Sequence, residues 1–147
     1  MNVAPDDYFV RVILVNAQGE MLLQLRSPGK EKYPNVWEYA AGGKREQGES
    51  WEEAALRELH EELGIAKNPE DLRMLMEFVL DPTYCGRPLG VRIYCAQYLG
   101  EQIIPAPREV AAVRFVQPEK LREELVANPD QFIPGMLMVM DQCWDKL

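Results

Sequence analysis

Three glutamates in the stretch GKREQGESWEEAALRELHEELGI have the spacing of a metal-binding group: Glu58, Glu61 and Glu62. On a helix, intervals of three and four residues place their carboxylates on one face. Like charges at these intervals repel by about 0.2–0.5 kcal/mol for each exposed pair, so a purely structural helix gains nothing from them. A hard divalent cation such as Mg²⁺ reverses the sign, because it prefers oxygen ligands and binds one or two carboxylates together with substrate phosphates. The pattern therefore predicts a metal site.

The residues around these acids are suited to support such a site. Arg57 lies four residues before Glu61 and four after Glu53, so we expect it to bridge acids along the helix and hold their rotamers. Glu49 lies immediately before the expected helix cap, at the positive end of the helix, within reach of the metal cluster or its waters. Gly42 and Gly43 precede the helix in an expected loop, where a residue without a side chain lets a backbone carbonyl approach a metal.

The whole segment resembles the Nudix box, in which Gly, Glu, Arg-Glu, Glu-Glu and Gly recur at fixed intervals with hydrophobic residues between them. The matching positions are Gly43, Glu49, Arg57, Glu58, Leu59, Glu61, Glu62, Gly64 and Ile65. The order of strands also resembles the family over nearly the whole chain. The resemblance implies an α/β fold, an αβα sandwich with a mixed β-sheet, in which the box forms a loop, a helix and a loop. It also implies hydrolysis of a phosphoanhydride (pyrophosphate) bond in a nucleoside diphosphate linked to another group.

The same resemblance implies the metal ligands. Glu58, Glu61 and Glu62 would bind Mg²⁺, with Mn²⁺ able to substitute, and the carbonyl of Gly43 would join them. One metal would activate water and others would neutralise the diphosphate, so an acidic protein could still hold an anionic substrate.

The general base varies within the family, and two residues compete for the role here. Glu58 is one candidate. The other is Glu109 in the stretch PREVAAVRF. Many relatives carry a second acid three residues later in that loop, where this chain has Ala112. We therefore expect Glu58 to be the base and keep Glu109 as the alternative.

Weaker signals concern substrate binding. Arg26 ends the second expected strand, and contact with a phosphate and a surface ion pair are equally open for it. Tyr39 could stack on a base, whereas core packing is the better expectation for Trp37. Tyr84 and Arg87 lie in a Pro- and Gly-flanked loop that is more typical of a plain turn than of a specificity site.

Two other functions compete with hydrolysis. The stretch LLQLRSPGKEKYPNVWEYAAGG also resembles isopentenyl diphosphate isomerase, but residues 40–43 are Ala-Ala-Gly-Gly where that family needs a cysteine and a nearby histidine. A non-catalytic, nucleotide-binding Nudix domain typically loses one or more box acids, and here they are intact. Nucleoside triphosphates, nucleotide sugars, ADP-ribose and dinucleoside polyphosphates all remain open as substrates.

The rest of the pattern predicts elements that would position this site. Strands are expected at residues 8–15, 21–25, 36–41, 72–80, 91–99 and 113–116, and a loop at 27–35. The box helix should begin after Ser50, with Glu53 completing a capping box, and should end at Gly64. Further helices are expected at 118–127 and 135–144.

Composition limits the partners. The 147 residues suit a single domain, and a net charge of −8 argues against general nucleic-acid binding. The N-terminus lacks a signal pattern and no apolar run has the length of a membrane span, so we expect a cytoplasmic protein without a membrane partner. Its three cysteines are too few and too scattered for a disulfide framework. The expected partner is a small nucleoside diphosphate derivative, and a homodimer is left open.

Overall fold

The computed structural model describes residues 7–80, 82 and 86–147. Within this part of the chain, seven strands form one mixed sheet in which five follow the order β3-β2-β1-β6-β5. β4 also pairs with β1, and β7 also pairs with β2. The β1 and β6 strands run parallel, and the other pairs are antiparallel. The strands are β1 Tyr8–Val15, β2 Met21–Arg26, β3 Trp37–Glu38, β4 Ala41–Lys44, β5 Arg73–Leu80, β6 Leu89–Gln97 and β7 Val110–Val116.

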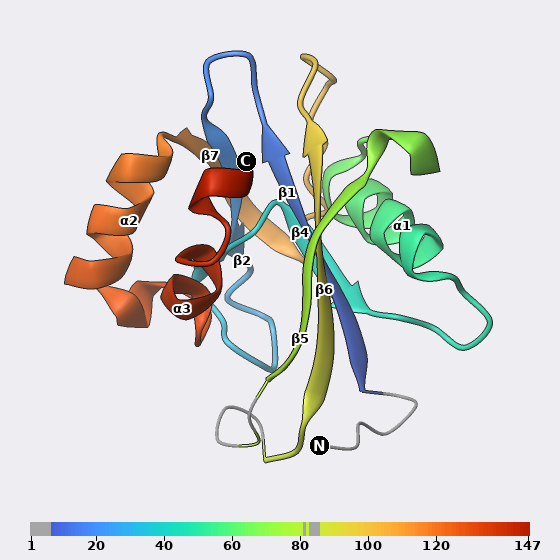
Figure 1. Cartoon of the computed structure of the whole chain (residues 1–147), viewed down its shortest axis with the longest axis horizontal. Coiled ribbons are helices and arrows are strands. Elements are labelled where there is room, and N and C mark those ends of the chain that lie inside the picture. The colour runs from blue at the N-terminus through green and yellow to red at the C-terminus, as the bar shows by residue number, and fades with distance from the viewer. Residues whose placement is uncertain (1–6, 81, 83–85) are drawn as a thin grey trace.

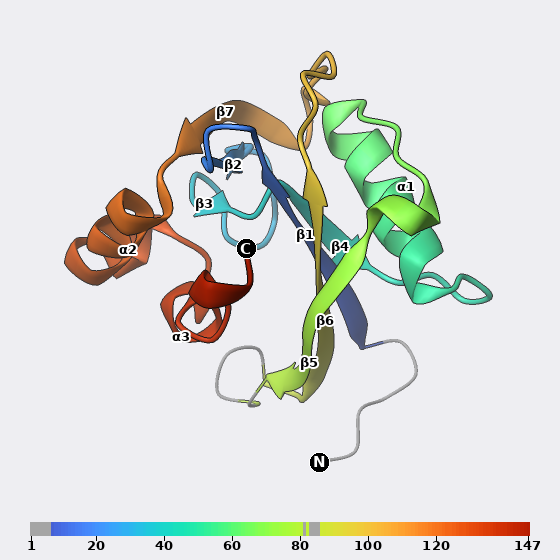
Figure 2. The ribbon, with the colours of Figure 1, turned by 45° about the horizontal axis from the view of Figure 1, so that its top comes forward.

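Helices cover both faces of this sheet. They are α1 Trp51–Leu63, α2 Pro118–Ala127 and α3 Met136–Met140, with short 3₁₀ turns at Pro69–Asp71, Pro129–Gln131 and Trp144–Lys146. Two views agree that α1 lies on one side of the sheet and that α2 and α3 lie on the other (Figures 1 and 2). The expected αβα sandwich is therefore confirmed. No helix in the described part of the chain is both long and apolar enough to cross a membrane.

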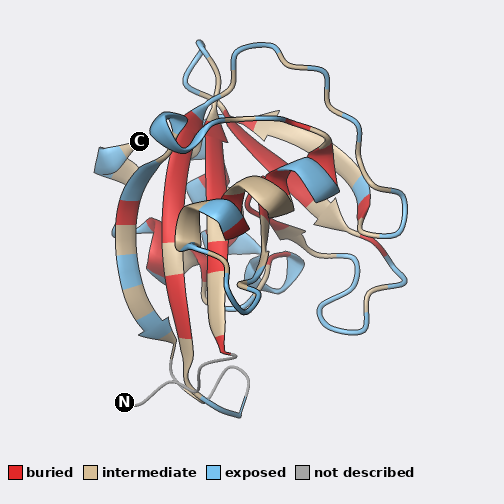
Figure 3. Cartoon of the chain, turned by 90° about the vertical axis from the view of Figure 1, so that its right-hand side faces the viewer, coloured by how far each residue is buried: buried red, intermediate tan, exposed pale blue. Residues whose placement is uncertain are grey.

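Side chains of β1 point alternately into two hydrophobic cores, one on each face of the sheet. Val10, Val12 and Leu14 are fully buried on the face that packs against α1. Ile13 is fully buried on the opposite face, among residues of α2 and α3. Successive side chains of a strand point to opposite faces, so one strand anchors both layers. Figure 3 shows the buried positions of the strands gathered behind α1.

The box helix α1 begins and ends where its sequence predicts. The Ser50 hydroxyl accepts a hydrogen bond from the Glu53 backbone N–H at 3.0 Å, and Glu53 Oε1 accepts one from the Ser50 N–H at 2.9 Å. Gly64 adopts a left-handed conformation at φ 69° and donates its N–H to the His60 carbonyl. These bonds satisfy backbone groups that a helix end otherwise leaves unpaired.

The strands expected at 91–99 and 113–116 begin two and three residues earlier in the structure, as β6 and β7, and two other expected elements differ more. The strand expected at 36–41 is split, because Trp37–Glu38 pairs with β2 while Ala41–Lys44 turns to pair with β1. Gly42 and Gly43 consequently lie inside a strand, and the expected loop at this position is wrong. The helix expected at 135–144 is also too long: α3 ends at Met140, where turns and a 3₁₀ segment take over.

Candidate active site

A cavity of about 900 Å³ opens beside the glycine pair of β4. It is bounded by β1, β2, β4, α1, β5 and β6, by the loop after β2, and by the segments that precede β7 and α3. The candidate site residues in its wall are Arg26, Tyr39, Gly43, Arg57, Glu58, Glu61, Glu62 and Glu109. The fold therefore brings together residues that are up to 83 positions apart in the sequence, from Arg26 to Glu109.

Arg57 lies at the centre of the acidic part of the wall. Its Nη1 donates to Glu58 Oε1 at 2.8 Å and to Glu61 Oε2 at 3.2 Å. Its Nη2 donates to the Lys44 carbonyl at 3.0 Å, which ties α1 to the end of β4. The expected contact of Arg57 with Glu61 is confirmed, but Glu53 bonds to Ser50 at the helix cap instead, and Glu49 takes the largest share of the Arg57 hydrogen bonds.

Glu49 is bound by Arg57 through both of its carboxylate oxygens. Arg57 Nε lies 2.7 Å from Oε2, and Nη2 lies 3.0 Å from Oε1. Hydrogen bonds from Arg57, followed by that from the Glu46 backbone, hold the pKa of Glu49 below its ordinary value. Glu49 does not belong to the cavity wall, and in this arrangement it orients Arg57. A role for Glu49 as a metal ligand stays a prediction.

Glu62 is a buried carboxylate, with 5% of its surface exposed. Gln24 Nε2, on β2, donates to Glu62 Oε1 at 2.6 Å and to the Ala40 carbonyl at 2.9 Å. The Gly42 N–H donates to Glu62 Oε2 at 3.3 Å. Burial above all raises the pKa of Glu62 to about 10, helped by the hydrogen bond that its protonated form donates to Glu58 and by repulsion from the carboxylates of Glu38 and Glu58. Gln24 was not singled out from the sequence, because nothing local marks it.

Glu58 approaches the sheet at Gly43. A Cβ on Gly43 would stand only 2.5 Å from Glu58 Cδ and Oε1. The glycine therefore leaves the space that the carboxylate occupies, next to the buried carboxylate of Glu62.

These residues suit a divalent cation. A carboxylate is costly to bury as an anion, and a second carboxylate beside it adds repulsion, unless a positive charge compensates both. Within residues 7–80, 82 and 86–147, no three acidic, histidine or cysteine side chains converge closely enough to hold an ion as they stand. Arg57 binds Glu58 and Glu61 instead. A cation would compete with Arg57 for these two carboxylates.

Comparison with known proteins supports the family. A family model described as the NUDIX domain matches residues 8–136. The chain belongs to the Nudix family of hydrolases. A Nudix hydrolase of Pseudomonas aeruginosa is 35% identical over 132 residues, which cover 88% of this chain and 72% of that protein. An isopentenyl-diphosphate Delta-isomerase of Paenarthrobacter aurescens is 36% identical over 126 residues, which cover 84% and 67%.

Solved structures show the same fold. A crystal structure from Deinococcus radiodurans matches with a TM-score of 0.78 at 24% identity, over 98% of this chain and 88% of that one. The NUDIX domain of Shewanella oneidensis NrtR, complexed with ADP ribose, matches with a TM-score of 0.75 at 15% identity, over 98% and 90%. At these identities the likeness establishes the Nudix fold, as the box predicted.

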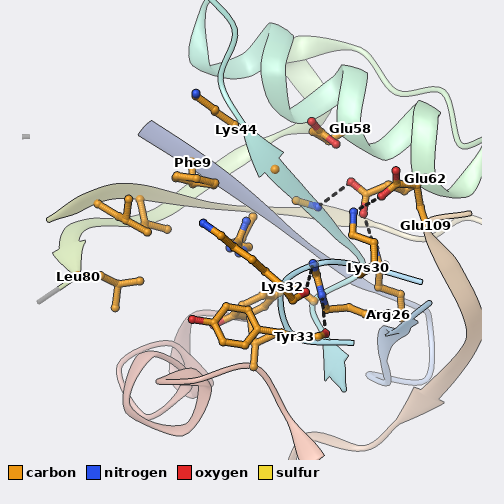
Figure 4. Close-up of a pocket in the computed structure, with 18 of the residues that line it drawn as sticks. Phe9, Arg26, Lys30, Lys32, Tyr33, Lys44, Glu58, Glu62, Leu80 and Glu109 are labelled. Atoms are coloured by element: carbon orange, nitrogen blue, oxygen red, sulfur yellow. Dashed lines mark hydrogen bonds and ion pairs between the residues drawn. The ribbon is translucent and has the colours of Figure 1, made fainter. Parts of the chain in front are cut away.

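The alternative base of the Nudix site, Glu109, lies at the same end of the cavity as Glu62 of α1 (Figure 4). It forms an ion pair with Lys30, from the loop that follows β2, and 46% of its side chain is exposed (Figure 4). Glu58 is far less exposed, at 14%. Both carboxylates thus line the cavity, and their roles as bases remain predictions.

The two residues expected to bind substrate are both more enclosed than their sequence suggests. Arg26 donates to Glu38 Oε2 at 2.5 Å and to the Lys32 and Tyr33 carbonyls at 2.8 and 2.9 Å, so it fastens its own loop. Tyr39 is 2% exposed in the core, where burial raises the pKa of its hydroxyl. Little of its ring is open to a stacked base, and substrate binding by either residue stays a prediction.

The loop between β5 and β6 is described only in part. Tyr84 lies outside the described residues. Arg87 lines the cavity and its Nε lies 2.7 Å from Asp7 Oδ1. Three lysines that the sequence did not single out, Lys30, Lys32 and Lys44, also line the cavity. No periodic pattern marks them, because they come from loops and a strand end.

Proposed function

We propose that this Nudix protein hydrolyses a phosphoanhydride bond in a nucleoside diphosphate derivative with the help of a divalent cation. The observation that carries the proposal is the buried carboxylate of Glu62 beside Glu58, at the wall of a cavity that also holds several cationic side chains. Glu58, Glu61 and Glu62 would hold Mg²⁺, for which Mn²⁺ would substitute. The bound cation lowers the pKa of a water molecule and offsets phosphate charge.

The chain's own groups supply the remaining requirements. Lys30, Lys32 and Lys44 bring positive charge to the cavity and favour an anionic substrate. Gln24 fixes the rotamer of Glu62 through its 2.6 Å hydrogen bond. Glu58, or alternatively Glu109, would accept the proton of the attacking water, which a carboxylate does directly or through one further water molecule.

The ADP ribose bound by the Shewanella domain supports a nucleoside diphosphate derivative as the substrate class, since that domain shares the fold. The similarity to the isomerase of Paenarthrobacter aurescens makes isomerisation of isopentenyl diphosphate the second candidate function. Two observations favour hydrolysis here. Ala40 and Ala41 are fully buried where the isomerase family is expected to carry its cysteine, and no cysteine or histidine belongs to the described cavity wall.

The test is a substrate panel with the purified protein and Mg²⁺, followed by release of phosphate and pyrophosphate and by separation of the organic products. It should include nucleoside triphosphates, nucleotide sugars, ADP-ribose, dinucleoside polyphosphates and isopentenyl diphosphate. We expect hydrolysis of at least one nucleoside diphosphate derivative, its loss in EDTA, and its recovery with Mg²⁺ or Mn²⁺. Full turnover in chelator would refute the metal mechanism, and isomerised isopentenyl diphosphate without hydrolysis would favour the second function.

A further inference from the structure

Arg11 lies across β4 from the box acids. It is paired with Gly42 in the β1–β4 ladder. A Cβ on Gly42 would stand 2.7 Å from Arg11 Cδ and 2.9 Å from Nη1, so the arginine side chain passes directly over this glycine. Because neighbouring strand residues face opposite ways, Gly43 leaves room for Glu58 on the other face. Arg11 and Glu58 nevertheless line one cavity, and β1 is the only described strand with which β4 pairs.

The guanidinium of Arg11 has no carboxylate partner among the described residues. Its Nη1 donates to the Val10 carbonyl at 3.1 Å, and its Cζ lies 5.7 Å from the centre of the Phe9 ring. Arg26 and Arg57, which share the cavity wall, each bind at least one carboxylate. A partly buried cation that faces a cavity without a counter-ion favours an anionic ligand there.

Apolar side chains share the cavity wall with Arg11. Phe9, Phe78, Leu80 and Leu89 are all partly buried in the wall. Figure 4 places Phe9 and Leu80 at one end of the cavity and Glu62 and Glu109 at the other. The cavity thus has an acidic end, suited to a metal-bound phosphate, and an apolar end, suited to an organic group. Arg11, against Phe9 and over Gly42, lies between the two.

We propose that Arg11 is a substrate-binding residue that holds one phosphate of the diphosphate, the one bonded to the organic group at the apolar end of the cavity. The other phosphate, which is attacked, lies at the box acids. This assignment rests on the proposed function. A guanidinium presents a planar fork that matches two phosphate oxygens. β4 pairs with no second strand among the described residues, so its free edge opens onto the cavity that Arg11 and Glu58 both line, and a diphosphate lying along this edge would contact both. The organic group then packs against the wall of Phe9, Phe78, Leu80 and Leu89.

The experiment measures binding rather than turnover. Calorimetric titrations in Mg²⁺ would use two non-hydrolysable probes: methylenediphosphonate, which has no organic group, and adenosine 5′-(α,β-methylene)diphosphate. We expect Arg11→Gln to weaken both by about ten- to hundredfold, the usual effect of losing hydrogen bonds to a charged group. Arg11→Lys keeps the charge but loses the fork, so its affinity should fall in between. Arg122→Gln is the matched control, because Arg122 is 54% exposed on α2 and lies outside the cavity wall.

The outcomes separate this assignment from its alternatives. Unchanged affinity in Arg11→Gln, with a lower melting temperature, would make Arg11 a structural residue and overturn the proposal. Weaker binding of the adenosine probe alone would mean that Arg11 contacts the nucleoside, which also overturns it. If Arg11→Gln does not fold, the comparison of Arg11→Lys with wild type decides in the same way. If wild type binds neither probe in Mg²⁺, the proposed function itself fails and the assignment with it.

Discussion

The carboxylate of Glu58 occupies the space that a side chain on residue 43 would need. A Cβ there would stand 2.5 Å from Glu58 Cδ and Oε1, and 2.8 Å from Oε2. Arg57 Nη1 meanwhile donates a hydrogen bond to Glu58 Oε1 at 2.8 Å. Gly43 is therefore required by the close approach of α1 to β4, and its place in the box has a steric cause in this structure.

The substitution Gly43→Ala should displace Glu58 while leaving the fold intact. We expect kcat to fall by about 10²-fold, the effect of a misplacement of about 1 Å at a reacting centre. Gly29→Ala is the matched control, because a Cβ there meets only Ser27 Oγ, at 3.7 Å. Steady-state kinetics of both variants decides the matter, and a Gly43→Ala rate within twofold of wild type would contradict the steric argument.

Arg57 should not tolerate replacement by lysine. A lysine cannot bind both oxygens of Glu49 while reaching Glu58 and Glu61, because it lacks the planar fork. We expect Arg57→Lys to lower kcat by at least tenfold and the melting temperature by several degrees, since hydrogen bonds to charged groups contribute about 1.5–3 kcal/mol. Arg122→Lys, at an exposed ion pair with Asp141, should change neither. Equal effects of the two variants would show that the guanidinium fork of Arg57 is not required for activity or stability.

Local signals explain how much of the site the sequence predicted. The cap at Ser50, the glycine at 64 and the spacing of Glu58 and Glu62 all act within a few helical turns, so they can be read directly from the chain. Non-local contacts could not be read in this way. Gln24 reaches Glu62 across 38 positions, and no residue near Gln24 indicates that partner.

The glycine pair also shows that the sequence predicts a local feature without its distant partner. Gly42 and Gly43 predicted a close backbone approach, and such an approach exists on both faces of the strand. The neighbour of Gly42 is Arg11, which is brought there by the β1–β4 ladder. Since that pairing depends on the chain leaving β3 for a different partner strand, a strand pattern alone could not locate it.

Glu62 should give the metal-free protein an unusual pH dependence. Its pKa is raised from 4.5 to about 10, chiefly by burial, so the folded state binds this proton more tightly than the unfolded chain. The associated stability is fully present below about pH 4.5 and is lost as pH rises toward 10. In EDTA, the melting temperature of wild type should therefore fall between pH 6 and 9 more steeply than that of Glu62→Gln.

The same variant separates stability from catalysis. Glu62→Gln should lose orders of magnitude in turnover while its metal-free fold is retained, and Glu61→Gln should lose turnover likewise. Glu123→Gln removes an acid that is 74% exposed on α2 and should follow wild type in both measurements. A large loss of metal-free stability in Glu62→Gln at neutral pH would show instead that the carboxylate makes structural bonds that an amide cannot replace.

The identity of the general base can be decided by comparing Glu58 with Glu109. Glu58 is fixed on α1, where Arg57 and the space above Gly43 set its position. Glu109 lies before β7, is 46% exposed, and is paired with Lys30 of a facing loop, so proton abstraction requires that ion pair to open. Removal of a general base costs about 10²–10⁴ in rate. We expect Glu58→Gln to lose at least that much and Glu109→Gln distinctly less, both measured at saturating Mg²⁺ because Glu58 would also hold metal.

The variant Lys30→Gln adds a further check. If Glu109 only anchors the loop through its ion pair, Lys30→Gln and Glu109→Gln should lower kcat by similar, modest amounts. A greater loss of kcat in Glu109→Gln than in Glu58→Gln would assign the base to Glu109.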